Sequence, residues 1–199
     1  IREVIKESQR LGVKHLTLYA FSTENWKRPK LEVDTLMTLL ATYLSKEIKE
    51  LHANNVKVTT IGDISKLPKN CIEQLNNAFE LTKDNTGVNL NLALNYGSRD
   101  DIKNAIIDIL NDAKCGKINI EEINENTIKN YLDTKSIPDP DLIIRTSGEQ
   151  RLSNFLMWEA AYSEFYFTDI HWPDFNRTEL QKAIYVYQNR DRRFGGLSK

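Results

Sequence analysis

The sequence lacks several features that would place it in a familiar class of protein. Its only two cysteines, Cys71 and Cys115, are isolated and form no CxxC motif, which disfavours a disulfide framework or a zinc site. No apolar run is long enough to cross a membrane as a helix. Lysine and arginine number 27 against 28 aspartates and glutamates, so the overall positive charge of many nucleic-acid-binding proteins is absent. These absences favour a cytoplasmic protein that does not bind nucleic acid.

Common nucleotide-binding and catalytic motifs are also missing. There is no GxGxxG and no GxxxxGKS/T sequence. The three histidines are widely separated and form no HExxH motif, so a zinc hydrolase has little support. Asp100 and Asp101 could suggest the aspartate-rich metal site of trans-prenyl synthases. They stand in the first turn of a predicted helix, however, where acidic residues are favourable, and we interpret them as helix capping.

Apolar patterns predict strands that alternate with helices along the whole chain. Short apolar or alternating runs predict strands at 15–20, 56–61, 88–95, 142–144 and 164–167. Apolar residues at helical spacing predict helices at 1–11, 29–51, 68–84, 99–111, 126–132, 155–161 and 178–190. This alternation is typical of a single α/β domain, here residues 1–199, with a mostly parallel central β-sheet and helices on both faces.

Two polar segments follow predicted strands at the end where open α/β sheets bind ligands. Residues 21–29 read FSTENWKRP, and residues 145–155 read RTSGEQRLSNF. In the second segment, Arg145, Arg151 and Ser153 could together hold a diphosphate. Each guanidinium can bond two oxygens and stays charged at any working pH. The alternative is a pair of solvated arginines in a surface loop.

The predicted helix at 29–51 carries a wide apolar face. Leu39 and Tyr43 extend it beyond the stripe that one sheet-facing surface needs, and a broad core face is the simpler explanation. Beside two anion-binding segments, however, such a face gives the outline of a pocket for a lipid diphosphate. The candidate lining residues are Leu36, Leu39, Leu40, Tyr43, Leu75 and Phe79.

Five segments, taken in order, resemble the sequence blocks of the cis-prenyltransferase family, most closely those of its bacterial undecaprenyl diphosphate synthases. They are residues 21–29, the NYG sequence at 95–97, residues 145–155, WPDF at 172–175 and RFGGL at 193–197. The resemblance implies an enzyme that uses Mg²⁺ to condense isopentenyl diphosphate with an allylic diphosphate such as farnesyl diphosphate. Each condensation makes a cis double bond. The expected product is undecaprenyl diphosphate, a lipid carrier for cell-wall synthesis.

The resemblance also implies roles for individual residues. Asn25 matches a residue proposed to help remove a proton; because an amide is a weak base, we expect it to position the substrate instead. Glu164 matches a metal-linked glutamate, although a surface acid at the start of a strand is the alternative. The expected substrate-binding residues are Ser22, Thr23, Glu24, Trp26, Arg28, Arg145, Arg151, Leu152 and Ser153.

One family feature is absent from the 199 residues: an N-terminal strand followed by an Asp-Gly-Asn-Gly-Arg-Trp loop, whose aspartate supports Mg²⁺ and the allylic diphosphate. We therefore expect that the sequence begins inside the domain and that a polypeptide of these residues alone is inactive. The resemblance further implies a homodimer whose lipid product brings it into transient contact with the inner membrane face. Two other interpretations stay open: a non-catalytic scaffold subunit of a cis-prenyltransferase complex, and a nucleotide-binding α/β module.

Overall fold

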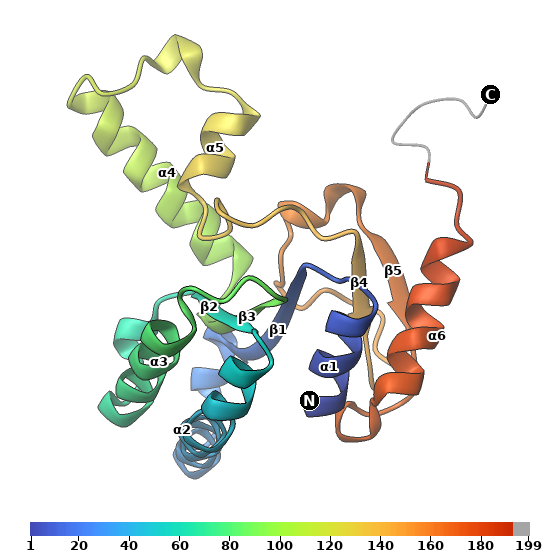
Figure 1. The fold of residues 1–199 in the computed structure, drawn as a ribbon. Coiled ribbons are helices and arrows are strands. Elements are labelled where there is room, and N and C mark those ends of the chain that lie inside the picture. Colours follow the sequence, from blue (N-terminus) through green and yellow to red (C-terminus); the bar gives the residue numbers. More distant parts are fainter. Residues whose placement is uncertain (193–199) are drawn as a thin grey trace.

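The strands within residues 1–192 form two parallel sheets. A computed structural model describes residues 1–192, so the RFGGL block at 193–197 lies outside the described residues. In this part of the chain three strands pair in the order β1-β3-β2, and the other two pair as β4-β5, all of them parallel (Figure 1). This confirms the predicted α/β fold with a parallel arrangement. The strands are β1 (His15–Ser22), β2 (Lys57–Ile61), β3 (Asn89–Tyr96), β4 (Leu142–Arg145) and β5 (Glu164–Phe167).

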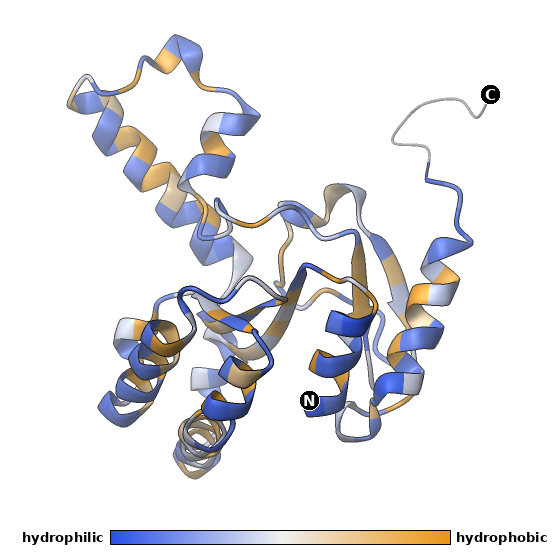
Figure 2. Ribbon diagram, in the orientation of Figure 1, coloured by the Kyte–Doolittle hydropathy of each residue, from blue (hydrophilic) through white to orange (hydrophobic). Residues whose placement is uncertain are grey.

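The helices pack in pairs around these strands. In Figure 1, α2 lies beside α3 and α1 beside α6, while α4 and α5 extend away from the strands as a pair. Figure 2 shows polar and apolar segments alternating along each helix, as expected where one face packs on a core. Among residues 1–192, none of the helices is both long and apolar enough to span a bilayer. The helices are α1 (Arg2–Arg10), α2 (Lys30–Ala53), α3 (Lys69–Thr82), α4 (Ser98–Lys114), α5 (Glu125–Tyr131) and α6 (Arg177–Gln188).

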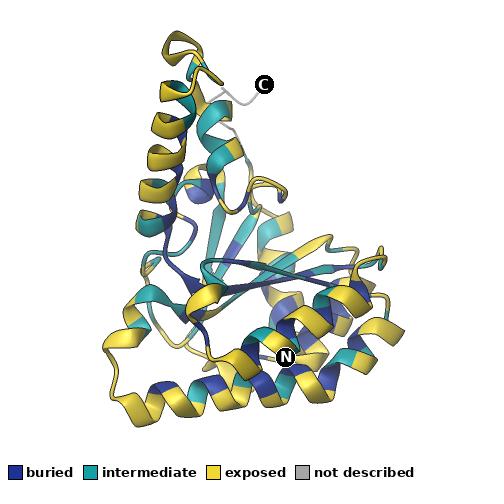
Figure 3. Cartoon of the chain, turned by 90° about the vertical axis from the view of Figure 1, so that its left-hand side faces the viewer, coloured by how far each residue is buried: buried dark blue, intermediate teal, exposed yellow. Residues whose placement is uncertain are grey.

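β3 is the central strand of the larger sheet and is buried on both faces (Figure 3). Its leucines, Leu90, Leu92 and Leu94, pack with α2 and α3 in the main core, and each contributes about 1.5–3 kcal/mol by burial. On the other face Asn91 is fully buried; it accepts a hydrogen bond from Thr59 (3.2 Å) and donates one to Thr17 (3.4 Å). Threonines on the neighbouring strands therefore satisfy an amide that would otherwise be costly to bury.

Two predicted boundaries differ from the structure. β1 continues through Phe21 and Ser22, because both residues remain paired with β3 after a bulge. The helix predicted at 155–161 is largely absent; only a 3₁₀ turn, η4 (Glu159–Tyr162), forms there. Leu156 has a φ of +45°, and a left-handed residue cannot belong to a right-handed helix.

The apolar face of α2 is narrower than the sequence suggested. Leu39 is 60 % exposed and so does not belong to the core. Leu36 and Leu40 are partly buried against the core, as is Phe79 of α3, and Leu75 is fully buried. Of the candidate lining residues, Leu36, Leu40 and Phe79 are therefore only partly covered by the core.

Candidate functional site

Three aromatic rings bring together the strand ends and the second polar segment. Tyr19 of β1 stacks on Phe155 with ring centroids 4.5 Å apart, and Tyr96 of β3 meets both rings edge-on. The Tyr19 hydroxyl also donates a hydrogen bond to the carbonyl of Tyr96 at 3.1 Å. The carboxyl ends of β1 and β3 and the residues after β4 therefore meet at one place.

The first polar segment is a 3₁₀ turn, η1 (Thr23–Lys27), held in place by two asparagines. The Asn25 Oδ1 accepts a hydrogen bond from the backbone N–H of Ser22 at 2.8 Å. The indole of Trp26 packs edge-on against Phe21, and its Nε1–H donates to Asn95 Oδ1 at 2.7 Å. Asn95, which the sequence suggested only as part of the NYG block, thus fixes Trp26.

Arg145 ends β4 beside Tyr19. Its backbone carbonyl accepts from Thr168 at 3.0 Å, which continues the β4–β5 pairing. Burial is the largest of the causes that raise the pKa of Tyr19 to about 12; the charge of Glu24 adds to the rise and that of Arg145 opposes it, so both charges act on the phenol. The Arg145 Nε is buried and has no hydrogen-bond partner among residues 1–192. An arginine N–H held in this way is available to an anion.

The other predicted ligands of the second segment lie nearer the surface. Arg151 is exposed and forms a salt bridge with Glu149 of the same loop. Ser153 is also exposed and has a φ of +52°, while Leu152 is half-buried. Surface salt bridges contribute little to stability, so the Arg151 guanidinium can exchange its partner at low cost.

Asn154 joins the two polar segments to each other. Its Nδ2 donates to Glu24 Oε1 at 2.8 Å, and its Oδ1 accepts from the backbone N–H of Arg99 at 2.9 Å. Its own carbonyl accepts from the backbone N–H of Ser98, also at 2.9 Å. One residue therefore contacts η1 and the start of α4 at once. Sequence reasoning missed it, since Glu24 and the start of α4 both lie far from Asn154 in the chain.

The start of α4 differs from the prediction. The helix begins at Ser98, one residue before the predicted start; Gly97 is its N-cap, and the Ser98 Oγ accepts from the backbone N–H of Met157 at 3.0 Å. A Cβ on Gly97 would lie 2.5 Å from Thr23 Oγ1 and 2.7 Å from Asn154 Nδ2. A side chain at this position would displace the side chains of Thr23 and Asn154, so glycine suits the close approach of the two polar segments.

Two of the predicted site residues lie away from this junction, by which we mean the contact of η1, the second polar segment and the start of α4. Glu164 begins β5 opposite Leu142, whereas Arg145 pairs with Phe167 at the other end of the same two strands. Three residues of strand separate the two positions by about 10 Å. The Glu164 carboxylate accepts from Arg190 at 2.6 Å. Arg28 follows η1 and forms an exposed salt bridge with Glu32.

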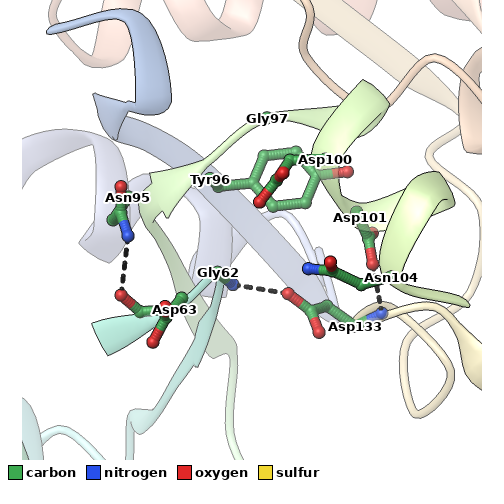
Figure 4. Close-up of a pocket in the computed structure, with 9 residues that line it drawn as sticks. All are labelled: Gly62, Asp63, Asn95, Tyr96, Gly97, Asp100, Asp101, Asn104 and Asp133. Atoms are coloured by element: carbon green, nitrogen blue, oxygen red, sulfur yellow. Dashed lines mark hydrogen bonds between the residues drawn. The ribbon is translucent and has the colours of Figure 1, made fainter. Parts of the chain in front are cut away.

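A pocket of about 90 Å³ lies beside the junction and is strongly acidic (Figure 4). Asp100 forms an exposed salt bridge with Lys103, but Asp101 is only 6 % exposed and accepts from the backbone N–H of Asp133 at 3.0 Å. The interpretation of both aspartates as helix caps is therefore wrong for Asp101, whose role is to fix the loop after α5. Asp63, Asp100, Asp101 and Asp133 line the pocket together with Gly62, Asn95, Tyr96, Gly97 and Asn104. Because four carboxylates repel an anion, this pocket does not suit a diphosphate.

Comparison with known proteins identifies a common family. Residues 1–195 match the family model described as "Putative undecaprenyl diphosphate synthase". The chain is 60 % identical to the isoprenyl transferase of Clostridium tetani over 197 residues, which cover 99 % of this chain and 77 % of that protein. It is 59 % identical to the isoprenyl transferase of Clostridium perfringens, covering 99 % of this chain and 78 % of that one.

Solved structures give the same result. The lavandulyl diphosphate synthase of Lavandula x intermedia, in complex with dimethylallyl diphosphate, matches with a TM-score of 0.95 and 38 % identity, over 98 % of this chain and 84 % of that one. A probable undecaprenyl diphosphate synthase from Campylobacter jejuni matches with a TM-score of 0.87 and 35 % identity, over 98 % and 89 %.

Proposed function

The chain belongs to the undecaprenyl diphosphate synthase family and is a cis-prenyltransferase, and we propose that it condenses isopentenyl diphosphate with an allylic diphosphate of the farnesyl type. The proposed product is undecaprenyl diphosphate for cell-wall synthesis. The observation that supports this reaction best is the junction of the two polar segments beside the unpaired Arg145 Nε. The scaffold alternative gains no support, since the relatives are named as transferases and synthases.

Arg145 is the proposed centre of the diphosphate site. A buried, charged N–H without a partner is costly, and a diphosphate oxygen would satisfy it with a charge-assisted hydrogen bond. Arg151 and Ser153, exposed on the same loop, would complete the site once Arg151 leaves Glu149. During the reaction these cations would stabilise the negative charge of the diphosphate groups.

Asn25 is proposed to position the substrate and not to act as a base. Its Oδ1 is already engaged by the backbone N–H of Ser22, so the group left for a substrate is the Nδ2, which can only donate. Such a donor would hold a diphosphate oxygen. Asn25→Asp should therefore reduce turnover more than Asn25→Ala, because it replaces that donor with a negative charge. Equal or higher turnover of the aspartate variant would contradict this role.

The hydrocarbon of the growing product is proposed to lie along α2 and α3. Leu36 and Leu40 of α2 and Phe79 of α3 are half-buried at the edge of the main core. An apolar surface there would keep water from the allylic cation and accept the lengthening chain.

Magnesium is the cofactor that the family resemblance implies. Among residues 1–192, no three His, Cys, Asp or Glu side chains are placed to hold a metal ion together. The Glu164 carboxylate is engaged by Arg190 and lies at the opposite end of β5 from the strand ends that carry Arg145. The described residues therefore do not fit a magnesium ion bound by the protein alone. We propose that Mg²⁺ is held mainly by the diphosphate groups, in keeping with its preference for phosphate oxygens and water.

Further proposals concern the assembly and the cellular setting. We propose that residues 1–199 form one domain of this family and that the protein is a cytoplasmic homodimer which contacts the inner membrane face when it releases product. Exposed aromatic side chains, including Phe167 of β5 and Trp172, support an interface in that region. Light scattering after size-exclusion chromatography tests the dimer, and Phe167→Glu should reduce the measured mass.

The reaction is tested with radiolabelled isopentenyl diphosphate, farnesyl diphosphate and Mg²⁺. The full natural chain should yield a long-chain polyprenyl diphosphate. Arg145→Lys keeps the positive charge but loses the guanidinium that can bond two oxygens at once. It should raise the KM for isopentenyl diphosphate about tenfold. Arg177→Lys, an exposed arginine of α6, should leave the KM unchanged. Failure of the natural chain to elongate the primer would refute the proposed function.

A polypeptide of the 199 residues alone is a separate case. It contains no Asp-Gly-Asn-Gly-Arg-Trp sequence. We propose that it binds isopentenyl diphosphate through Arg145 but does not turn it over. Calorimetric titration should detect that binding, and product formation by this polypeptide would contradict the proposal.

A further inference from the structure

We propose that Asn154 is a positioning residue for prenyl transfer, which fixes the loop carrying Arg151 and Ser153 against the segment carrying Glu24 and Asn25. This inference rests on the proposed function. It concerns a residue that is expected to touch neither substrate but to set the relative position of the two groups of side chains that do.

The backbone at Asn154 suits asparagine in particular. Its φ is +64°, and that of the preceding Ser153 is +52°. The left-handed region costs most residues about 1–2 kcal/mol, and asparagine enters it more readily than other residues with a side chain. This conformation turns the Asn154 carbonyl toward Ser98, whose N–H it accepts. The chain direction after Ser153 is therefore set at this residue.

The anchor on the other side is α4, a helix of 17 residues. The first backbone N–H groups of a helix have no partner within it. The N-cap, Gly97, has no side chain to satisfy them, and Asn154 supplies both missing acceptors, its carbonyl to Ser98 and its Oδ1 to Arg99. Asn154 thus caps α4 from a distant loop, and a long helix holds that loop in return.

The third bond reaches Glu24 in η1. Burial opposes ionisation of Glu24, but the hydrogen bonds its carboxylate accepts, the largest of them from Asn154, keep its pKa below the usual value. The carboxylate is therefore charged at neutral pH and accepts firmly from Nδ2. Because Asn25 follows Glu24 directly, this bond determines how far Asn25 stands from Ser153.

Two single substitutions separate the contributions of the side chain. Asn154→Gly keeps the left-handed backbone and the bond to Ser98, and removes only the side-chain bonds. Asn154→Asp keeps an acceptor for Arg99 but places a carboxylate against Glu24. In the full natural chain, we expect Asn154→Asp to lower kcat/KM for isopentenyl diphosphate about tenfold and Asn154→Gly about fivefold. Asn126→Asp, an exposed asparagine of α5, should change kcat/KM by less than about twofold.

The deciding test reverses the hydrogen bond. Glu24→Gln combined with Asn154→Asp restores a donor facing an acceptor, with the two roles exchanged. The double variant should recover to within about threefold of Glu24→Gln alone, so the two effects should not multiply. A merely structural role would lower the melting temperature without such recovery. If the aspartate single variant does not fold, the double variant and Asn154→Gly, which lack the paired carboxylates, give the result.

The outcomes separate the two proposals. If the unmodified protein makes no polyprenyl product, the proposed function fails. If it does, but the Glu24 and Asn154 effects simply multiply, or Asn154→Gly retains normal KM and kcat, the positioning role is overturned while the proposed function stands.

Discussion

Replacement of Asp101 by asparagine should stabilise the protein, and the gain should grow with pH. Asp101 is 6 % exposed; its Oδ1 accepts from the backbone of Asp133, and its Oδ2 is buried without a partner among residues 1–192. Burial raises the pKa of Asp101 to about 7, and the charges of Asp133 and Glu159 add to the effect. An asparagine keeps the acceptor oxygen but never carries the charge.

The direction follows from the proton balance. An aspartate in an unfolded chain has a pKa of about 3.9. Between that value and about 7, the folded protein keeps a proton on Asp101 that the unfolded chain has lost. The free energy of unfolding therefore decreases as pH rises through this window. At 1.36 kcal/mol per pKa unit, the cost above pH 7 amounts to about 4 kcal/mol at most. Asn154 and Arg145 are not involved in this balance.

Urea unfolding followed by circular dichroism, at intervals from pH 4 to pH 8, measures this cost directly. The advantage of Asp101→Asn over the unmodified protein should be small at pH 4 and should rise to a plateau above pH 7. Asp100→Asn is the matched control, because Asp100 lies in the same turn of α4, is far less buried than Asp101 and is paired with Lys103. It should stay within about 1 kcal/mol at every pH. A pH-independent difference for Asp101→Asn, or a loss of stability at pH 8, would show that burial does not control this carboxyl.

Two further pairs of variants test the packing. Gly97→Ala should lower kcat/KM about tenfold, because its Cβ would overlap Thr23 Oγ1. Gly116→Ala, with a φ of +70° and no atom within 4 Å, should cost about 1 kcal/mol of stability and leave kcat/KM unchanged. Steady-state kinetics that do not distinguish the two variants would contradict the close approach at Gly97. Leu75→Ala, at a fully buried position, should lower the free energy of unfolding in urea by roughly 2–5 kcal/mol. Leu39→Ala, at an exposed position, should lower it by less than about 0.5 kcal/mol. Equal losses would show that the two side chains lie in the same environment.

The order and type of the elements could be predicted from the sequence because apolar periodicity reports on burial, and burial drives this fold. The same signal fails where a residue's partner is remote. Phe21 and Ser22 belong to β1 only because they pair with Leu94 and Tyr96 of β3. Residues 155–161 have helical spacing, but the left-handed conformation of Leu156 prevents a continuous helix.

The candidate site, like the fold, has features that local sequence predicts and features that depend on remote partners. The position of Arg145 at the end of β4 could be predicted, since a cation at the end of a buried strand is visible in the sequence alone. Asn154 and Gly97 could not be given roles, because their functions depend on the approach of segments more than fifty residues apart. The role of Glu164 comes from the resemblance alone and stays a prediction; the register of β5 places the residue at the end of the strand away from Arg145.

The distribution of charge around the junction gives the site its direction. Gly97 contacts Thr23 and Asn154 on one side and lines the acidic pocket on the other. The ionised aspartates of the pocket repel a diphosphate, whereas the buried Nε of Arg145, whose charge acts on the Tyr19 phenol, attracts one. An incoming anion is thereby favoured on the side of η1 and the second polar segment. Neutralising the ionised aspartates of the pocket should weaken this preference, whereas Asp101→Asn removes little charge, because burial keeps that carboxyl largely protonated below about pH 7.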